Sequence, residues 1–156
     1  MSNKIDIKNI DLIIYDFDGV MTDNKVLVFQ DGREAVFCNR SDGLAISRIK
    51  GIGIPQLIIS TETNKVVEVR AKKLGIPVIY GIDSKEETVK KYCKEKNIDF
   101  KKVIYLGNDI NDLEIMKSVG CPIASADASK EIKNIAKIIT KAKGGEGIIR
   151  ELLEYF

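Results

Sequence analysis

Short, almost uninterrupted apolar runs recur along the chain and alternate with longer segments whose apolar residues return every three or four positions. The runs are residues 10–15, 56–59, 78–80, 103–106 and 122–124. Continuous apolar character of this kind is typical of strands covered on both faces of a parallel sheet. The segments with helical spacing are residues 42–50, 64–74, 85–96, 109–119, 129–136 and 147–155. This alternation predicts an α/β fold, a Rossmann-like parallel sheet with helices on both faces.

One segment departs from this alternation. Two mostly apolar runs, residues 26–29 and 34–37, flank the pair Asp31-Gly32, and Asp-Gly between two such runs favours a tight turn. We therefore predict a β-hairpin at about residues 25–37, inserted directly after the first predicted strand. Because no repeat or linker-like stretch is visible, the chain is expected to form a single domain over residues 1–156.

The charge of the chain is nearly balanced. Its 25 Lys and Arg residues against 23 Asp and Glu residues give a net charge of +2, which gives no reason to expect nucleic acid or an anionic membrane as a partner. No apolar run approaches the roughly 20 residues that cross a bilayer, and the first residues lack the apolar stretch of a signal peptide. A cytoplasmic location is therefore expected.

The chain contains no histidine. Serine–histidine and cysteine–histidine catalysis are thereby excluded, as are zinc sites built on imidazole. The three cysteines are odd in number and far apart, so reduced thiols are expected rather than disulfides. Acid–base chemistry must therefore come from carboxylates, Lys, Tyr or a metal-bound water.

Polar residues collect where the predicted strands end. The four clusters that follow successive strands are residues 16–23, 60–63, 81–85 and 107–112. In an open parallel sheet, ligands bind outside the carboxyl ends of the strands. The clusters are therefore expected to meet at one edge of the sheet.

The residue types in these clusters point to phosphoryl transfer. Carboxylates that lie close together repel unless a cation neutralises them, and an all-oxygen ligand set favours Mg²⁺. The Ser60 hydroxyl and Lys85 are suitable donors to a phosphate, and Gly19 allows close backbone approach. Taken singly, Asp109 could merely cap a helix and Lys85 could be solvated, but the ordered set favours a site.

With these residues in view, the sequence resembles the haloacid dehalogenase superfamily. Residues 16–22, Asp-Phe-Asp-Gly-Val-Met-Thr, look like its signature motif, while Ser60, Lys85 and residues 107–112 are similar to its later motifs. The hairpin in place of a large cap domain is similar to the capless sugar-acid phosphatases, a branch that includes the 3-deoxy-manno-octulosonate 8-phosphate phosphatases.

The resemblance implies a role for each matching residue. Asp16 would be the nucleophile and Asp18 the general acid and base, with Lys85 stabilising the transferring phosphoryl group. The phosphate-binding residues would be Gly19, Ser60, Thr61 and Lys85. The residues of the Mg²⁺ site would be Asp16, Asp18, Asn108, Asp109 and Asp112. The family usually has Asp where this chain has Asn108, so the metal site either loses one negative charge or uses Asp109 instead.

The residues after Ser60 bear on the substrate. Octulosonate phosphatases commonly have Gly-Arg there, whereas this chain has Thr61-Glu62. Glu62, with Arg70 and Lys73 on the next helix, resembles nonulosonate 9-phosphate phosphatases and the phosphatase-like domain of acylneuraminate cytidylyltransferases. We therefore expect a nonulosonate (sialic-acid-like) 9-phosphate as substrate, with octulosonate 8-phosphate as the alternative. Glu62, Arg70 and Lys73 would contact the sugar acid. The alternative is that they belong to a solvated helix face and do not contact the substrate.

The resemblance also bears on assembly. It implies a homotetramer whose hairpins form a central barrel, which would cover Val26, Val28 and Phe37. The glycines of residues 144–147 are either a mobile tail near the active site or a turn before the last helix.

Two other functional classes remain open from the sequence. One is a non-catalytic oligomerisation or regulatory module associated with an acylneuraminate cytidylyltransferase. The other is a phospho-accepting receiver domain, although that fold places its acceptor Asp after the third strand and has no hairpin.

Overall fold

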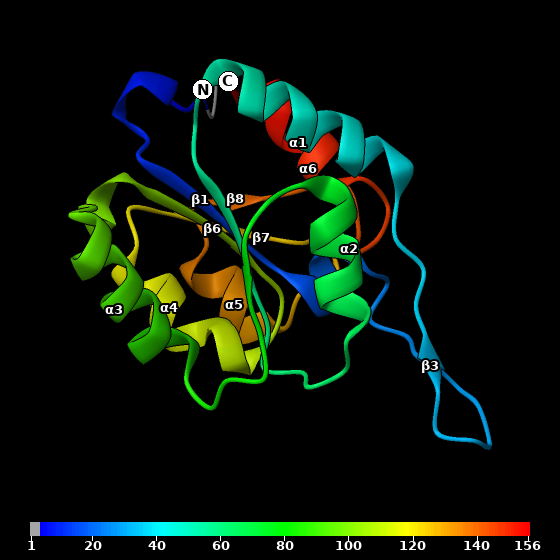
Figure 1. Ribbon diagram of the computed structural model, residues 1–156. Coiled ribbons are helices and arrows are strands. Elements are labelled where there is room, and N and C mark those ends of the chain that lie inside the picture. Colours follow the sequence, from blue (N-terminus) through cyan, green and yellow to red (C-terminus); the bar gives the residue numbers. More distant parts are fainter. Residues whose placement is uncertain (1–3) are drawn as a thin grey trace.

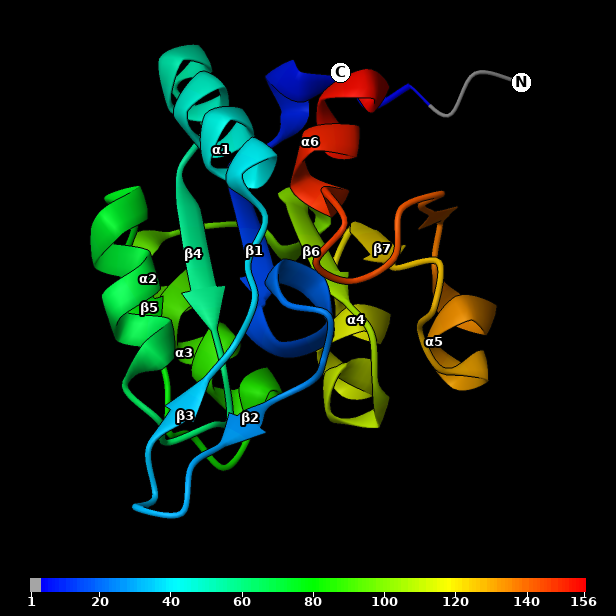
Figure 2. The same ribbon diagram turned by 90° about the vertical axis from the view of Figure 1, so that its right-hand side faces the viewer.

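A six-stranded parallel sheet lies between two layers of helices (Figures 1 and 2). The computed structural model describes residues 4–156. The strand order is β5-β4-β1-β6-β7-β8, and every pairing is parallel. The strands are β1 (Leu12–Asp16), β4 (Gln56–Ile59), β5 (Val78–Ile79), β6 (Val103–Gly107), β7 (Cys121–Ala124) and β8 (Ile138–Ile139). The predicted α/β sheet is confirmed, but β8 was not predicted, because two apolar residues are too few to show a strand pattern.

The helices divide evenly between the two faces of the sheet. One face carries α1 (Arg40–Ile52), α2 (Val66–Leu74) and α6 (Ile148–Leu152), and the other carries α3 (Lys85–Lys96), α4 (Leu113–Ser118) and α5 (Lys130–Ile135). Successive residues of β1 point to opposite faces, so Ile13 and Tyr15 pack under the first set while Leu12 and Ile14 pack under the second. All five residues of β1 are buried, as expected of a central strand.

Short helical turns occupy several connections. They are η1 (Ile7–Asn9), η2 (Phe17–Met21), η3 (Phe100–Lys102), η4 (Ile110–Asp112) and η5 (Leu153–Tyr155). The helix predicted over residues 109–119 is divided into η4 and α4. At the start of η4, the Asp109 and Asp112 side chains each accept a backbone N–H from the other end of the turn, a capping box that begins the helix.

The predicted hairpin is present but its strands are short. β2 (Leu27–Val28) pairs antiparallel with β3 (Glu34–Ala35), and the turn between them places Gly32 at φ +86°. The hairpin projects away from the sheet (Figures 1 and 2). Within residues 4–156, no helix has the length and apolar character needed to cross a membrane.

Candidate active site

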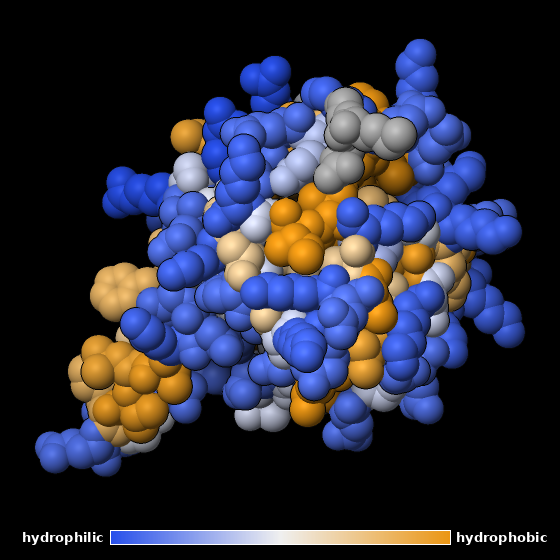
Figure 3. All heavy atoms as spheres, turned by 180° about the vertical axis from the view of Figure 1, so that it is seen from behind, coloured by the Kyte–Doolittle hydropathy of each residue, from blue (hydrophilic) through white to orange (hydrophobic). Residues whose placement is uncertain are grey.

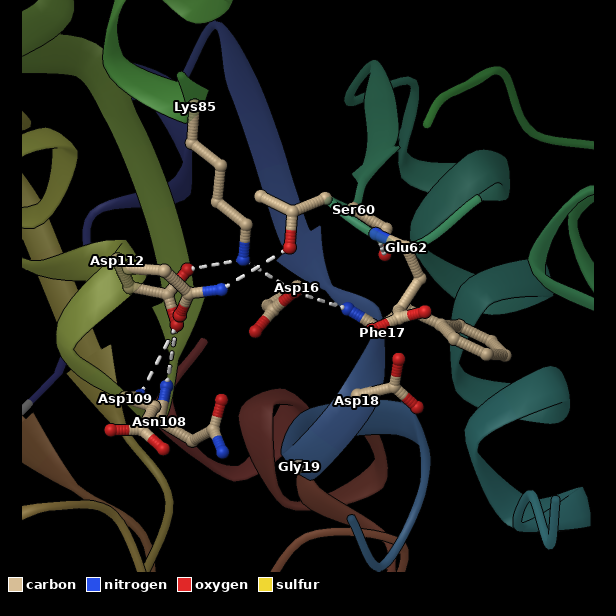
Figure 4. Close-up of polar contacts among 12 residues, drawn as sticks. Asp16, Phe17, Asp18, Gly19, Ser60, Glu62, Lys85, Asn108, Asp109 and Asp112 are labelled. Atoms are coloured by element: carbon tan, nitrogen blue, oxygen red, sulfur yellow. Dashed lines mark hydrogen bonds and ion pairs between the residues drawn. The ribbon is translucent and has the colours of Figure 1, made fainter. Parts of the chain in front are cut away.

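The polar clusters meet at the carboxyl edge of the sheet, as the sequence predicted. Asp16 is the last residue of β1, Ser60 follows β4, and Asn108 follows β6. Because β4, β1 and β6 are neighbours, these side chains face a common space (Figure 4). A cavity of about 210 Å³ opens there. It is lined by Asp16, Asp18, Asn24, Ser60, Thr61, Glu62, Asn108, Asp109, Ile110 and Asn111.

A buried lysine lies behind this cavity between two carboxylates. The Lys85 ammonium is 2.6 Å from Asp16 Oδ1 and 2.7 Å from Asp112 Oδ1, and its side chain is 1% exposed. Ser84 caps the helix that begins with Lys85 by accepting the Glu87 N–H, which sets the start of α3. Lys85 is thus held between Asp16 and Asp112 rather than solvated.

Both oxygens of Asp112 are engaged by hydrogen bonds. Oδ1 accepts from Lys85 and from the Tyr105 hydroxyl at 2.7 Å each, while Oδ2 accepts the backbone N–H groups of Asn108 and Asp109. The residue is completely buried. With both oxygens occupied, Asp112 orients Lys85 and the loop after β6 rather than contributing a free ligand oxygen.

Tyr105 is a site residue that the sequence analysis missed. It lies inside the apolar run that forms β6, so the sequence pattern indicates only a buried strand residue. Its hydroxyl reaches Asp112 only in the folded sheet. Its nearest sequence signal is its position two residues before Gly107 at the end of the strand.

Replacing Tyr105 by phenylalanine should lower kcat several-fold, because Asp112 would hold Lys85 less firmly. The lost buried hydrogen bond to a charged group should also reduce the free energy of unfolding by about 1.5–3 kcal/mol. Tyr15→Phe is the matched control: that hydroxyl is also buried in the neighbouring strand and donates to Gln56 Oε1 at 2.7 Å. Steady-state kinetics and thermal unfolding test both variants. Equal activity losses in the two would contradict the role given to Tyr105.

Burial and neighbouring charges shift the pKa values of Asp16, Asp18 and Lys85. Burial, and then the Asp112 charge, raise the pKa of Asp16 well above its usual value, while Lys85 acts in the opposite direction. Burial also raises the pKa of Asp18, which suits a group that must hold a proton before giving it away. For Lys85, burial opposes the ammonium form, but Asp16 and Asp112 outweigh it and raise the pKa.

The surroundings of Asn108 fit a hard cation. Asn108 Oδ1 is buried and has no hydrogen-bond partner in residues 4–156, and an orphaned acceptor of this kind needs a ligand. Its side chain fills the space beside Gly19, where a Cβ would lie 1.9 Å from Asn108 Nδ2. Over the same residues, no three Cys, Asp or Glu side chains converge as a metal cluster. A cation here could take the Asn108 amide oxygen and the Asp16 carboxylate as ligands, since both line the cavity.

The loop between Asp18 and Asn24 is organised by Thr22. The Thr22 hydroxyl donates to Asp18 Oδ1 at 3.2 Å and accepts the N–H groups of Gly19 and Asn24. Asp18 is therefore held at the mouth of the cavity by its own loop. Asn24, which the sequence analysis did not select, lines the cavity because it follows Thr22 with a left-handed φ of 65°.

Three of the remaining predicted residues, Thr61, Glu62 and Asp109, line the cavity. Thr61 and Glu62 follow Ser60, whose hydroxyl accepts the Glu62 N–H. Glu62 also lines a second cavity, beside the hairpin, and Asp18 and Asn24 line both. Asp109 also lines the cavity, and its Oδ1 accepts the Ile110 N–H at the start of η4.

Arg70 and Lys73 are not brought to this cavity within the chain. They line a separate hollow between α1 and α2, together with Arg40 and Leu44. Arg70 Nη2 donates instead to the backbone carbonyl of Asn39 at 3.1 Å. The two residues therefore lie outside the cavity that Asp16 lines, because the face of α2 that carries them turns toward α1.

Comparison with known proteins agrees with this geometry. Residues 78–152 match the family model of haloacid dehalogenase-like hydrolases. The chain is 33% identical in sequence to the 3-deoxy-D-manno-octulosonate 8-phosphate phosphatase KdsC of Yersinia pestis. The alignment covers 94% of this chain and 79% of that one. The chain belongs to the haloacid dehalogenase-like hydrolases.

Two further relatives place this haloacid dehalogenase-like hydrolase more closely. One is the Moraxella catarrhalis 3-deoxy-D-manno-octulosonate 8-phosphate phosphatase, whose sequence is 30% identical to this chain. Its crystal structure is a complex with a magnesium ion, a phosphate ion and a KDO molecule. It superposes with a TM-score of 0.91 over 95% of this chain and 86% of that one. N-acylneuraminate cytidylyltransferase A of Danio rerio is 28% identical over 92% of this chain but only 34% of its own length. The chain is a phosphatase, which sets aside the receiver-domain and non-catalytic alternatives.

Proposed function

We propose that this phosphatase hydrolyses the phosphomonoester of a 2-keto-3-deoxy sugar acid through an aspartyl-phosphate on Asp16. The observation that carries the proposal is the arrangement of Asp16, Lys85 and Asp18 around one cavity. Asp16 Oδ1 accepts hydrogen bonds from Lys85 and the Phe17 N–H, so Oδ2 is the oxygen directed at phosphorus. A carboxylate so oriented is a competent nucleophile.

Asp18 transfers a proton in opposite directions in the two half-reactions. Oδ2 of Asp16 forms a bond to phosphorus as the bond to the leaving oxygen breaks, and Asp18 gives that oxygen its proton. Asp18 then takes a proton from water, whose oxygen attacks phosphorus and releases inorganic phosphate and the Asp16 carboxylate. The Lys85 ammonium neutralises charge on the phosphoryl oxygens throughout, and the Ser60 hydroxyl donates a hydrogen bond to them.

Mg²⁺ is the proposed cofactor. The residues that would hold it are Asp16, the Asp18 backbone carbonyl and Asn108, with Asp109 nearby. The ion would neutralise the phosphoryl oxygens and favour the ionised form of Asp16, whose pKa burial raises. Calorimetric titration with MgCl₂ tests this, and absence of a binding signal at millimolar concentrations would contradict it.

Glu62 favours a nine-carbon substrate within this class. Its carboxylate receives no hydrogen bond or ion pair from the residues between 4 and 156, and it lies between the two cavities. The second cavity adds apolar walls at Val36, Val66 and Val67. A carboxylate beside apolar walls suits the N–H and the methyl group of an acylamino substituent, which the N-acylated, sialic-acid-like nonulosonates carry. The octulosonate 8-phosphate is the alternative, favoured by the activity named for the relatives.

A substrate comparison with Glu62→Gln tests this assignment. With Mg²⁺, kcat/KM should be higher for a nonulosonate 9-phosphate than for octulosonate 8-phosphate, and both should exceed glucose 6-phosphate. Glu62→Gln should lower kcat/KM for the preferred sugar acid about tenfold, since one charged hydrogen bond is weakened, and should spare p-nitrophenyl phosphate. Glu131→Gln, an exposed position on α5, is the control. A preference for the octulosonate phosphate would select the alternative.

A homotetramer built on the hairpins is also proposed. The hairpin carries five exposed hydrophobic side chains, visible as the projecting orange cluster in Figure 3. They are Val26, Leu27, Val28, Phe29 and Phe37, which is 78% exposed. Apolar surface concentrated on a projecting element indicates burial against another chain. Light scattering should give four chain masses, and a monomeric protein at micromolar concentration would contradict the proposal.

A further inference from the structure

Two glycines near the C-terminus pack directly on the loop that follows Asp16. The Gly145 N–H donates to the Val20 carbonyl at 3.1 Å. A Cβ on Gly144 would lie 2.4 Å from Gly19 O, and one on Gly145 would lie 2.6 Å from Asp23 N. Only glycine permits such close backbone contact. These residues therefore form a turn packed against the active-site loop, and not a free tail.

The active-site loop is confined from its other side as well. Gly19 faces the Asn108 side chain, with no room for a Cβ between them. The backbone of residues 19–23 therefore lies between Asn108 and Gly144–Gly145. A shift of the glycine turn would move the loop that carries Asp18, because tightly packed backbone transmits displacement.

The glycine turn is itself held by Asn39. Asn39 Nδ2 donates to the Gly145 carbonyl at 3.2 Å, while its Oδ1 accepts the Ser41 N–H and caps α1. The Asn39 carbonyl in turn accepts from Arg70 Nη2. Hydrogen bonds thus run from α2 through Asn39 and Gly145 to Val20, beside the catalytic acid.

The segment after the glycines is anchored to the same helix. Asp42 Oδ1 accepts the N–H groups of Ile149 and Arg150 at 3.0 Å each. These two groups lie in the first turn of α6, where an N–H has no acceptor within the helix. The first turn of α1 therefore holds the glycine turn at Gly145 and also the helix that follows it.

We infer that Asn39 and Arg70 are positioning residues that hold Gly144–Gly145 against the active-site loop and so place Asp18 and the loop amides for phosphoryl transfer. The inference rests on the proposed chemistry of Asp16 and Asp18, but not on the identity of the sugar acid. It also gives Arg70 a role within the chain that differs from the substrate contact expected from the sequence.

Kinetics on two substrates separate these roles. Arg70→Ala should lower kcat about tenfold on both p-nitrophenyl phosphate and octulosonate 8-phosphate, with each KM changed less than about twofold, because misplaced groups slow the chemical step. Lys72→Ala removes an exposed cation from the same helix and should leave both activities unchanged. A rise in KM confined to the sugar acid phosphate would make Arg70 a substrate contact and overturn the inference.

Asn39→Asp isolates the central hydrogen bond. Aspartate still caps α1 but cannot donate to the Gly145 carbonyl. The variant should retain the Tm of the parent while losing kcat on both substrates, and Arg70→Lys, which keeps a donor, should recover part of the Arg70→Ala loss. Unchanged kcat in Asn39→Asp refutes the inference. If the parent protein itself hydrolyses neither substrate, the proposed function fails instead.

Discussion

Asp16→Asn should abolish turnover while leaving the fold intact. The amide cannot form an acyl phosphate, so kcat should fall by about 10⁴-fold or more. The amide oxygen of the variant can keep the contacts that Asp16 Oδ1 makes with Lys85 and the Phe17 N–H, and the change removes a buried carboxyl whose pKa burial raises. The Tm should therefore stay close to that of the parent. Phosphate release and circular dichroism measure the two effects.

Asp18→Asn provides the matched comparison, because it keeps the nucleophile and removes the acid–base group. With p-nitrophenyl phosphate as substrate, p-nitrophenolate leaves without needing a proton from Asp18, so this variant should form the aspartyl-phosphate and hydrolyse it slowly. Intact mass after rapid quenching should show one added phosphoryl group, located on the peptide that contains Asp16. Turnover by Asp16→Asn within about tenfold of the parent would exclude Asp16 as the nucleophile.

Lys85→Met should cost both activity and stability. The loss of a buried cation leaves the Asp16 and Asp112 carboxylates without their common partner, which destabilises folded proteins by about 3–5 kcal/mol. The Tm should therefore fall by about 10 °C. With no ammonium to neutralise the phosphoryl oxygens, kcat should fall by about 10³-fold.

The stability loss of Lys85→Met should depend on pH with a defined sign. Lys85 lowers the pKa of Asp16, so its removal raises that pKa further above the usual value. The folded carboxyl then binds its proton more tightly than the unfolded one, so stability is lost as pH rises through the folded pKa and recovered at acidic pH. Thermal unfolding across this range measures the effect.

Lys90→Met is the control for the lysine substitution. Lys90 lies on the same helix, with an exposed side chain paired to Glu86, and its removal should change the free energy of unfolding by less than about 1 kcal/mol. Equal losses in the two variants would show that the helix, and not the buried ion pair, responds to the substitution.

Much of the fold follows from local patterns. A continuous apolar run such as residues 103–106 indicates a buried strand. Successive side chains of a strand point to opposite faces of the sheet, so an apolar residue at every position requires helices on both faces. The edge at which Asp16, Ser60 and Asn108 meet also follows, since parallel strands share one carboxyl edge. β8 could not be predicted, because its two residues pair with Ile123 and Ala124 only once the sheet exists.

The sequence alone therefore determined five strands of the sheet, the edge at which the site lies and that residues such as Asp16, Ser60 and Asn108 reach the cavity, since these depend on periodicity and on order along the chain. The tertiary structure decided which side chains pair: Tyr105 and Lys85 with Asp112, Arg70 with Asn39, and Asn39 with Gly145. Such pairs join residues on different elements, so their hydrogen bonds depend on how strands and helices pack in three dimensions. No spacing along the chain encodes that packing.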